Sequence, residues 1–276
     1  MMPVDAQMGL LSFKMDQFSQ NGEDGIVERI FHLIGAETRT CCEFGAWDGV
    51  HLSNTRRLLL EGWSGLFIEA DPRRFKKLKG NYSRTAKVGC VCKLVDNAHD
   101  LESALSQNGF LAALDILVID IDGLDYYILE ELKIRPRVIC VEVNAGHSPE
   151  SDAMLPRHLA AKNIGQPLAA FCQSSEDLGY ALIAFNGNAF LLRNDITHPL
   201  LPELDPVTAY AEYVESLDKA ARRWMYLVNR GLVPPYFQFR NDYLSASELN
   251  LGAVDLSIAI FRCMLLRSRG LLRRCA

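Results

Sequence analysis

The chain of 276 residues is 49% hydrophobic and 23% charged, which is typical of an ordinary globular protein. Its net charge of −5 and its pI of about 5.7 argue against non-specific binding of nucleic acid over the whole surface. No apolar run reaches the roughly 18 residues of a transmembrane helix, and the N-terminus, interrupted by Asp5 and Lys14, lacks the basic-then-apolar pattern of a signal peptide.

The chain has eight cysteines, and their positions favour free thiols in a reducing environment over disulfides. No C-x-x-C pair is present, so a structural zinc site is not expected. Five cysteines fall in apolar segments that we predict to be core strands, where a free thiol acts as a small hydrophobe. We therefore predict a cytoplasmic protein. The five are Cys41, Cys42, Cys90, Cys92 and Cys140.

The first predicted helix follows the polar stretch S-Q-N-G-E-D at 19–24. Ser19 is a helix-capping residue type, and apolar residues recur at helical spacing from Ile26. Two interpretations of the polar stretch stay open. It is a solvated helix entry, or it is a lid over a ligand, with Gln20 or Asp24 near the amino-acid end of that ligand.

A glycine turn follows the first predicted strand, in E-F-G-A-W-D-G at 43–49. Glycine lets the backbone approach a ligand, and a helix after the turn offers free N–H groups, although a tight turn without a ligand is the alternative. Gly45 and Gly49 lack the middle glycine of the dinucleotide fingerprint. Glu43 would repel a pyrophosphate and attract an ammonium group, which favours S-adenosylmethionine over a dinucleotide.

The second predicted strand, 65–70, carries an acid at its carboxyl end. This residue, Glu69, lies about twenty residues beyond the glycine turn, where the first βαβ unit should return. A carboxylate at that position can accept both ribose hydroxyls of a nucleoside.

Three more strands alternate with helices, and a hairpin follows them. The Asn186-Gly187 pair is a strong hairpin signal. We therefore predict an α/β fold: a Rossmann-like, doubly wound, mostly parallel sheet with a terminal antiparallel β-hairpin. Such a hairpin is typical of class I methyltransferases. The strands are predicted at 87–95, 114–120, 138–143, 180–185 and 189–193.

Polar residues gather at the predicted carboxyl ends of the strands, where ligands bind in such sheets. Asp120, Asp122 and His147 are candidates for the general base that a hydroxyl acceptor needs. As alternatives, Asp120 only holds the cofactor or caps a helix, and His147 is only solvated. Asp120, Asp122 and Asn144, with Asp125 and Glu142, are also an oxygen-rich set suited to Mg²⁺, unless the acids only cap helices.

The predicted alternation of strands and helices ends before residue 199, and only helices are predicted beyond it. We predict a ligand-binding domain over 1–198 and a helical C-terminal extension over 199–276. The extension has helices over 206–230 and 256–272, and several arginines end the second one. This second helix packs on the core or on a second subunit in a homodimer, the interpretation we favour, or rests on an anionic membrane surface near a glycolipid.

Five motifs together resemble the FkbM-type methyltransferases, a branch of the class I S-adenosylmethionine-dependent family. The likeness covers roughly residues 16–195 and implies O-methylation of a sugar or another small polar metabolite. One departure is Asp122-Gly123, where the family commonly has Glu-Gly. The motifs are S-Q-N-G-E-D-G at 19–25, E-F-G-A-W-D-G at 43–49, F-I-E-A-D-P at 67–72, I-D-I-D-G at 119–123 and V-E-V-N at 141–144.

By position, the resemblance implies that the glycine turn borders the methionine part of the cofactor and that Glu69 takes the ribose. Two alternatives remain: a catalytically inactive binding protein on the same fold, and a NAD-dependent oxidoreductase. No nucleic-acid partner is expected. The residues expected to contact S-adenosylmethionine are Gln20, Asp24, Glu43, Gly45, Ala46, Gly49, Glu69, Ala70, Asp96 and Asp120.

Overall fold

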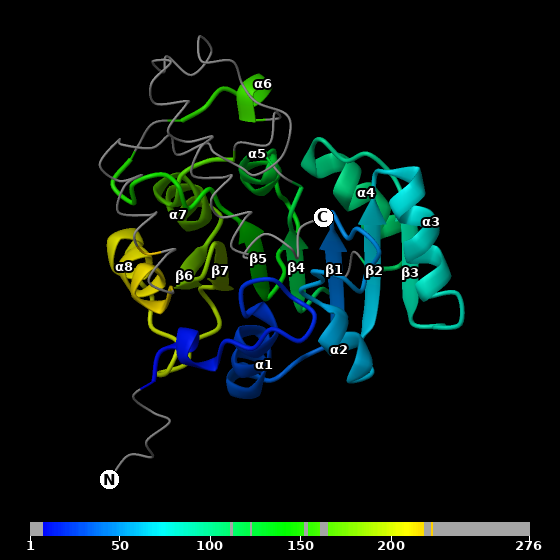
Figure 1. Ribbon diagram of the computed structural model, residues 1–276, viewed down its shortest axis with the longest axis horizontal. Helices are drawn as coiled ribbons and strands as arrows, with labels where there is room; N and C mark the ends of the chain where they lie inside the picture. Colours follow the sequence, from blue (N-terminus) through cyan, green and yellow to red (C-terminus); the bar gives the residue numbers. More distant parts are fainter. Residues whose placement is uncertain are drawn as a thin grey trace, which may run out of the picture.

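A computed structural model describes residues 8–110, 113–121, 123–151, 154–160, 165–217 and 222. Within these ranges the chain forms one seven-stranded sheet in the order β3-β2-β1-β4-β5-β7-β6 (Figure 1). The strands are β1 (Thr40–Phe44), β2 (Ser64–Glu69), β3 (Val88–Cys92), β4 (Ile116–Ile119), β5 (Val138–Glu142), β6 (Tyr180–Phe185) and β7 (Asn188–Arg193).

Helices cover both faces of the sheet. α4, α5, α7 and α8 pack on one face, while α1, α2 and the 3₁₀ helix η2 pack on the other, with α3 over the Phe67 side chain of β2. The bounds are η2 (Leu10–Phe13), α1 (Glu23–Ile34), α2 (Arg56–Leu60), α3 (Pro72–Asn81), α4 (Ala98–Gln107), α5 (Asp125–Glu130), α6 (Arg157–Ala160), α7 (Leu168–Asp177) and α8 (Pro206–Ser216).

The central strands form because their apolar runs are buried on both faces. On β4, Ile116 and Val118 pack toward α1, and Leu117 and Ile119 pack toward α5. All four side chains are at most 1% exposed. The sheet topology reverses between β1 and β4, so this is the switch point at which doubly wound sheets bind ligands.

The terminal hairpin is confirmed. β6 and β7 pair antiparallel across the Asn186-Gly187 turn, and Gly187 has the φ of +109° that such a turn favours. β7 then pairs antiparallel with β5, with Cys140 opposite Phe190. The predicted fold class is therefore correct: a mostly parallel α/β sheet that ends in an antiparallel hairpin.

Several predicted details differ from the structure. The helix expected over 206–230 ends at Ser216, because Leu217 has an extended backbone (ψ 154°); residues 218–221 and 223–230 lie outside the described residues. The third strand ends at Cys92 rather than at 95 and lies at the sheet edge, so the Cys92 side chain is exposed.

Other features agree with the sequence analysis or lie beyond the described residues. The six described cysteines are all free thiols. No described helix is both long enough and apolar enough to cross a bilayer. The expected helix over 256–272 lies outside the described part of the chain.

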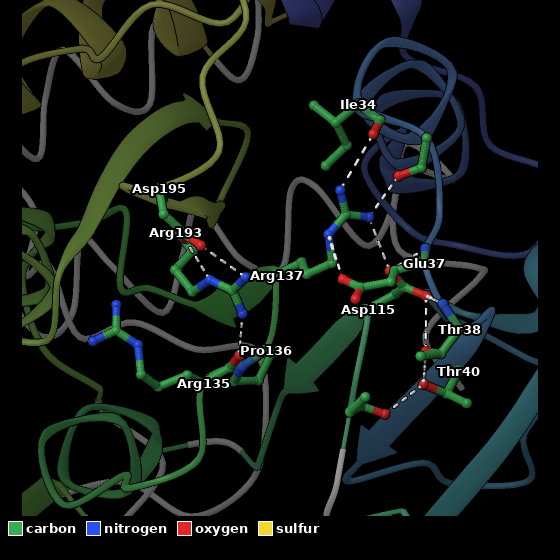
Figure 2. Close-up of polar contacts among 12 residues, drawn as sticks. Ile34, Glu37, Thr38, Thr40, Asp115, Arg135, Pro136, Arg137, Arg193 and Asp195 are labelled. Atoms are coloured by element: carbon green, nitrogen blue, oxygen red, sulfur yellow. Dashed lines mark hydrogen bonds and ion pairs between the residues drawn. The ribbon is translucent and has the colours of Figure 1, made fainter.

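A buried carboxylate holds the loop between α1 and β1 at the end of the sheet opposite the switch-point ligand edge. Asp115, just before β4, is 0% exposed. Its oxygens accept the backbone N–H groups of Glu37 (2.9 Å), Thr38 (2.8 Å) and Arg39 (2.7 Å), and also the Thr38 hydroxyl (3.0 Å) (Figure 2). A loop that is otherwise irregular thereby has its N–H groups satisfied.

Arg137 completes this cluster. Its Nη1 lies 3.0 Å from the Asp115 carboxylate, and the same guanidinium donates to the carbonyls of Ile34 (3.2 Å) and Gly35 (2.6 Å) at the end of α1 (Figure 2). Burial alone would raise the pKa of Asp115, but these N–H, hydroxyl and guanidinium donors outweigh it and lower the pKa below its ordinary value.

Asp115→Asn is expected to destabilise the protein by about 3 kcal/mol, because the loop N–H groups lose a charged buried acceptor and Arg137 keeps only the exposed Glu37, 3.7 Å away, as counter-charge. Urea unfolding at pH 7 measures the change. Asp195→Asn is the matched control: Asp195 pairs with Arg193 at 2.6 Å, but its side chain is 63% exposed, so its loss costs less than about 1 kcal/mol. Equal losses in the two variants would contradict the assigned role of Asp115.

Candidate active site

A cavity of about 320 Å³ lies at the carboxyl ends of β1, β2, β4 and β5, at the switch point. Its size suits a small-molecule ligand. The lining residues are Gln20, Glu43, Phe44, Gly45, Ala46, Trp47, His51, Leu52, Ile68, Glu69, Ala70, Arg74, Lys93, Leu94, Val95, Asp96, Asp120, Ile121, Leu124 and Glu142.

The turn after β1 brings the backbone against two neighbouring strands. The N–H groups of Gly45 and Ala46 both donate to the carbonyl of Ile68 on β2 (3.0 and 3.1 Å). Gly45 has a φ of +84°, and a Cβ atom there would lie 1.7 Å from the carbonyl oxygen of Asp120 after β4. Only glycine therefore fits at this position, independently of any ligand.

Glu69 lies at the end of β2 and is only 5% exposed. One carboxylate oxygen accepts the N–H of Trp47 (2.8 Å), and the other accepts the N–H of Asp71 (2.7 Å). Each oxygen has a second lone pair, so the carboxylate can accept further donors from a ligand in the cavity. The contacts fix Glu69 relative to both the glycine turn and the start of α3.

Glu43, at the end of β1, holds the loop that leads into α2. Its carboxylate accepts the hydroxyls of Ser53 (2.7 Å) and Thr55 (2.6 Å), and the N–H groups of Asn54 and Thr55 (both 3.1 Å). Burial raises the pKa of Glu43, and these four donors oppose that rise. The carboxylate borders the cavity, but most of its hydrogen-bonding capacity serves the loop.

The loop before α1 contributes Gln20 to the cavity and is held by two buried acids. Asp24 accepts the N–H groups of Gln17, Phe18 and Ser19 on a single oxygen (2.9, 2.7 and 3.0 Å). Its carboxylate is only 1% exposed and does not line the cavity, so Asp24 positions the loop.

Glu23 joins the same loop to the β6–β7 turn. One of its oxygens accepts the N–H groups of Gln20 (3.2 Å) and Asn21 (2.8 Å). The other accepts the side-chain amides of Asn186 and Asn188, both at 3.1 Å. Burial raises the pKa of this fully buried carboxyl, while the backbone N–H of Asn21 lowers it. Ser19 is not the N-cap residue, because α1 begins after Gly22, but its hydroxyl accepts the N–H of Asp24 in the first turn (3.1 Å).

The cavity is predominantly acidic. Five carboxylates line it, against one lysine, one arginine and one histidine. Lys93 forms an ion pair with Asp100 (2.8 Å), and the Arg74 guanidinium lies 4.0 Å from the ring centroid of Trp47. The acids are Glu43, Glu69, Asp96, Asp120 and Glu142.

The structure brings eight of the ten expected cofactor contacts together around the cavity and leaves two outside its lining. The two are Asp24 and Gly49; a Cβ atom on Gly49 would lie 2.6 Å from Leu78 and Tyr82, so this glycine serves packing. The other eight are Gln20, Glu43, Gly45, Ala46, Glu69, Ala70, Asp96 and Asp120.

The candidates for the general base are placed differently from one another. Asp120 lines the cavity, whereas His147 does not line it and is 6% exposed. Burial lowers the pKa of His147 to about 4, so the imidazole is neutral at pH 7. Asp122 lies outside the described residues. The catalytic roles of all three stay predictions.

No group of three or more His, Cys, Asp or Glu side chains is placed to hold a metal ion among the residues that the structure describes. Asp125, one of the proposed oxygen ligands, instead accepts the N–H groups of Ile121 (2.8 Å) and Gly123 (2.7 Å) at the start of α5. Asn144 accepts the N–H of Gly146 (2.9 Å) and does not line the cavity. The Mg²⁺ site stays a prediction, since Asp122 is not described.

Sequence reasoning missed part of the lining, chiefly Trp47, His51, Leu52, Arg74 and Lys93. Arg74 follows Asp71-Pro72, and Asp71 caps α3 by accepting the N–H groups of Arg73 (2.7 Å) and Arg74 (3.0 Å). This Asp-Pro helix start was a usable signal, because it fixes the first turn of α3 next to the end of β2.

Comparisons with known proteins identify no family for this chain. No protein-family model matches it, and no curated protein does. Similar solved structures include an O-methyltransferase from Bacillus cereus in complex with SAH (15% identity, 66% of this chain and 85% of that chain, TM-score 0.42) and a SAH-bound methyltransferase from Podospora anserina (14%, 56% and 71%, 0.35). An O-methyltransferase family protein from Burkholderia thailandensis is also similar (12%, 69% of this chain and 54% of that chain, 0.38). Likeness at this level assigns no activity to the chain.

Gly45→Ala is expected to destabilise the protein by more than about 3 kcal/mol, because a backbone carbonyl blocks the new methyl group. Thermal and urea unfolding measure the loss. Gly62→Ala is the matched control: Gly62 also has a positive φ (+90°), but no atom lies within 4 Å of where its new methyl group would be, so this change should cost only about 1 kcal/mol. If both variants lose a similar free energy of unfolding, then backbone strain, rather than the contact with the Asp120 carbonyl, is the reason that position 45 requires glycine.

Because the pKa of His147 is lowered in the folded protein, the free energy of unfolding should fall as the pH is lowered from about 6.5 to about 4. In this range the unfolded chain binds a proton that the buried imidazole does not, which costs about 3 kcal/mol by pH 4. His147→Gln should remove this component of the pH dependence, and His32→Gln, which changes an exposed histidine, should not. Parallel pH–stability curves for wild type and His147→Gln would contradict the assignment.

Proposed function

We propose that this protein is an S-adenosylmethionine-dependent methyltransferase. The observation that carries the proposal is the acid-lined cavity at the switch point, with the buried Glu69 at the end of β2. A carboxylate at this position suits the two hydroxyls of a ribose.

The charge of the cavity favours this cofactor over a dinucleotide. S-adenosylmethionine has a sulfonium, an ammonium and one carboxylate, so it is a net cation. Five carboxylates, set against one lysine and one arginine, attract such a ligand, whereas they repel the pyrophosphate of NAD. The acid Glu43 also stands where a dinucleotide-binding turn must accept phosphate. The residues present therefore fit S-adenosylmethionine.

Glu69 would hold the ribose, the turn from Gly45 to Trp47 would border the methionine part, and Asp96 would lie beside the adenine. When bound, S-adenosylmethionine supplies an electrophilic methyl group. The protein's contribution is mainly to position the reactants. Asp120 lies at the end of β4 on the cavity wall and would take the proton of a hydroxyl acceptor.

The finer assignment rests on the motif resemblance to FkbM-type methyltransferases. It supports O-methylation, with a sugar or another small polar metabolite as acceptor. The free cysteines support a reducing, cytoplasmic location. A catalytically inactive binding protein would share the cavity but would show no turnover.

Calorimetric titration should detect binding of S-adenosylmethionine and S-adenosylhomocysteine at micromolar strength. Glu69→Gln should weaken it about 10- to 100-fold, because a charged acceptor for the ribose hydroxyls is lost. The matched control is Glu203→Gln, which changes an exposed acid away from the cavity and should bind as wild type does.

The same titration separates the alternatives. No binding of either compound, together with binding of NAD, would replace the proposed function by that of an oxidoreductase. Equal loss of affinity in Glu69→Gln and Glu203→Gln would mean that Glu69 does not hold the ribose.

A further inference from the structure

The positive charge of the chain is concentrated at one end of the sheet. Residues 72–95 contain eight Lys and Arg residues and no Asp or Glu, although the whole chain has a net charge of −5. The segment forms α3 and the edge strand β3, which lie together at the β3 end of the sheet (Figure 1). Six of the eight side chains are exposed, and we call them the α3 surface: Arg73, Lys76, Lys77, Lys79, Arg84 and Lys87.

The α3 surface is electrostatically unfavourable in the isolated protein. Arg73 is three and four residues from Lys76 and Lys77, and Lys76 is three residues from Lys79, so like charges repel along one helix face. Arg73 also lies in the first turn, where the helix dipole disfavours a cation. The N-cap, Asp71, opposes this charge at the start of α3, and the helix dipole favours Lys79 in the last turn.

No acidic side chain of the described residues offsets the remaining charge by contact. Among the described residues, none of the six cations forms an ion pair. Within the same part of the chain, only one of the six side chains donates a hydrogen bond, from the Lys87 ammonium to the carbonyl of Gly62 (3.0 Å). A surface that costs stability and has no internal partner is explained by an external anionic partner.

Two exposed leucines lie at opposite ends of the parallel strands β2 and β3, at the edge of the sheet that carries the α3 surface. Leu94, 72% exposed, follows Lys93 just after β3, and Leu60, 60% exposed, lies two residues before the Gly62 that Lys87 contacts. They are the two most exposed large apolar side chains in the described part of the chain. A cationic surface flanked by exposed leucines combines the two chemistries found at a bilayer surface.

We infer that the α3 surface binds an anionic lipid bilayer. Lipid phosphates would neutralise the six cations, and Leu60 and Leu94 would enter the interfacial layer. Nucleic acid would satisfy the cations but leave the leucines in water, so the leucines favour the bilayer. Each Lys or Arg near an anionic membrane strengthens binding about fivefold, or about 1 kcal/mol.

The cavity borders the segment that carries this surface. Arg74 on α3 and Lys93-Leu94 after β3 belong both to the basic segment and to the cavity lining. On the bilayer, this wall of the cavity would therefore lie close to the lipid headgroups. Membrane binding itself does not rest on the proposed methyltransferase activity, since it depends only on the α3 surface.

Co-sedimentation with vesicles tests the inference on the full chain. Wild type should bind vesicles containing about one-third phosphatidylglycerol, should not bind pure phosphatidylcholine, and should be released at about 1 M salt, where charges are screened within about 3 Å. The triple variant K76Q/K77Q/K79Q should bind about 100-fold more weakly. It should be folded and at least as stable as wild type, because repulsion on α3 is relieved.

Three further sets of variants sharpen the test. K76R/K77R/K79R keeps the charge and should bind as wild type does, whereas L60S/L94S should bind more weakly at unchanged charge. Replacing Arg267, Arg269, Arg273 and Arg274 by Gln separates the α3 surface from the basic end of the chain, and this variant should keep its binding.

Three outcomes would overturn the inference. The first is wild type that does not bind anionic vesicles. The second is vesicle binding that survives K76Q/K77Q/K79Q and disappears in the C-terminal arginine variant. The third is binding of a single-stranded RNA oligonucleotide in place of vesicles, which would make the α3 surface a nucleic-acid site.

Discussion

Buried carboxylates hold the irregular segments of this protein in place. A backbone N–H group shut away from water must find an acceptor, and one carboxylate can accept several. Here each of six buried acids accepts two or three N–H groups of a loop or turn, and the donors in return stabilise the buried charge. The six acids are Glu23, Asp24, Glu43, Glu69, Asp115 and Asp125.

The placement of these acids builds the cavity before any ligand arrives. Glu69 fixes the glycine turn at Trp47, Glu43 fixes the loop that follows His51 and Leu52, and Glu23 and Asp24 fix the loop that contributes Gln20. Asp115 holds a loop in the same way, by accepting its N–H groups, at the opposite end of the sheet. A site whose walls are already held by hydrogen bonds loses little conformational entropy when it binds a ligand.

The fold could be predicted from the sequence because the apolar runs, the acids at strand ends and the Asn186-Gly187 turn each indicate a single kind of local structure.

The site could be predicted less completely. Acids at strand ends mark where a ligand binds, but the residue type does not reveal which N–H groups a carboxylate accepts, so Asp24 was expected at the ligand. Trp47 and Arg74 were missed because their places depend on a turn with a φ of +49° and on the start of α3. The helix expected over 206–230 is interrupted after Ser216, because the apolar stripe of the sequence does not reveal the extended backbone at Leu217.

The order of the last strands has a consequence for synthesis of the chain. β6 is made before β7, yet β7 lies between β5 and β6. Until Arg193 has left the ribosome, β6 has no neighbouring strand, and the side chains of Leu182, Ile183 and Phe185, buried in the folded protein, have no sheet to join. Such an unpaired apolar strand is prone to aggregate. A nascent chain that stalls between residues 186 and 193 therefore depends on chaperones to stay soluble.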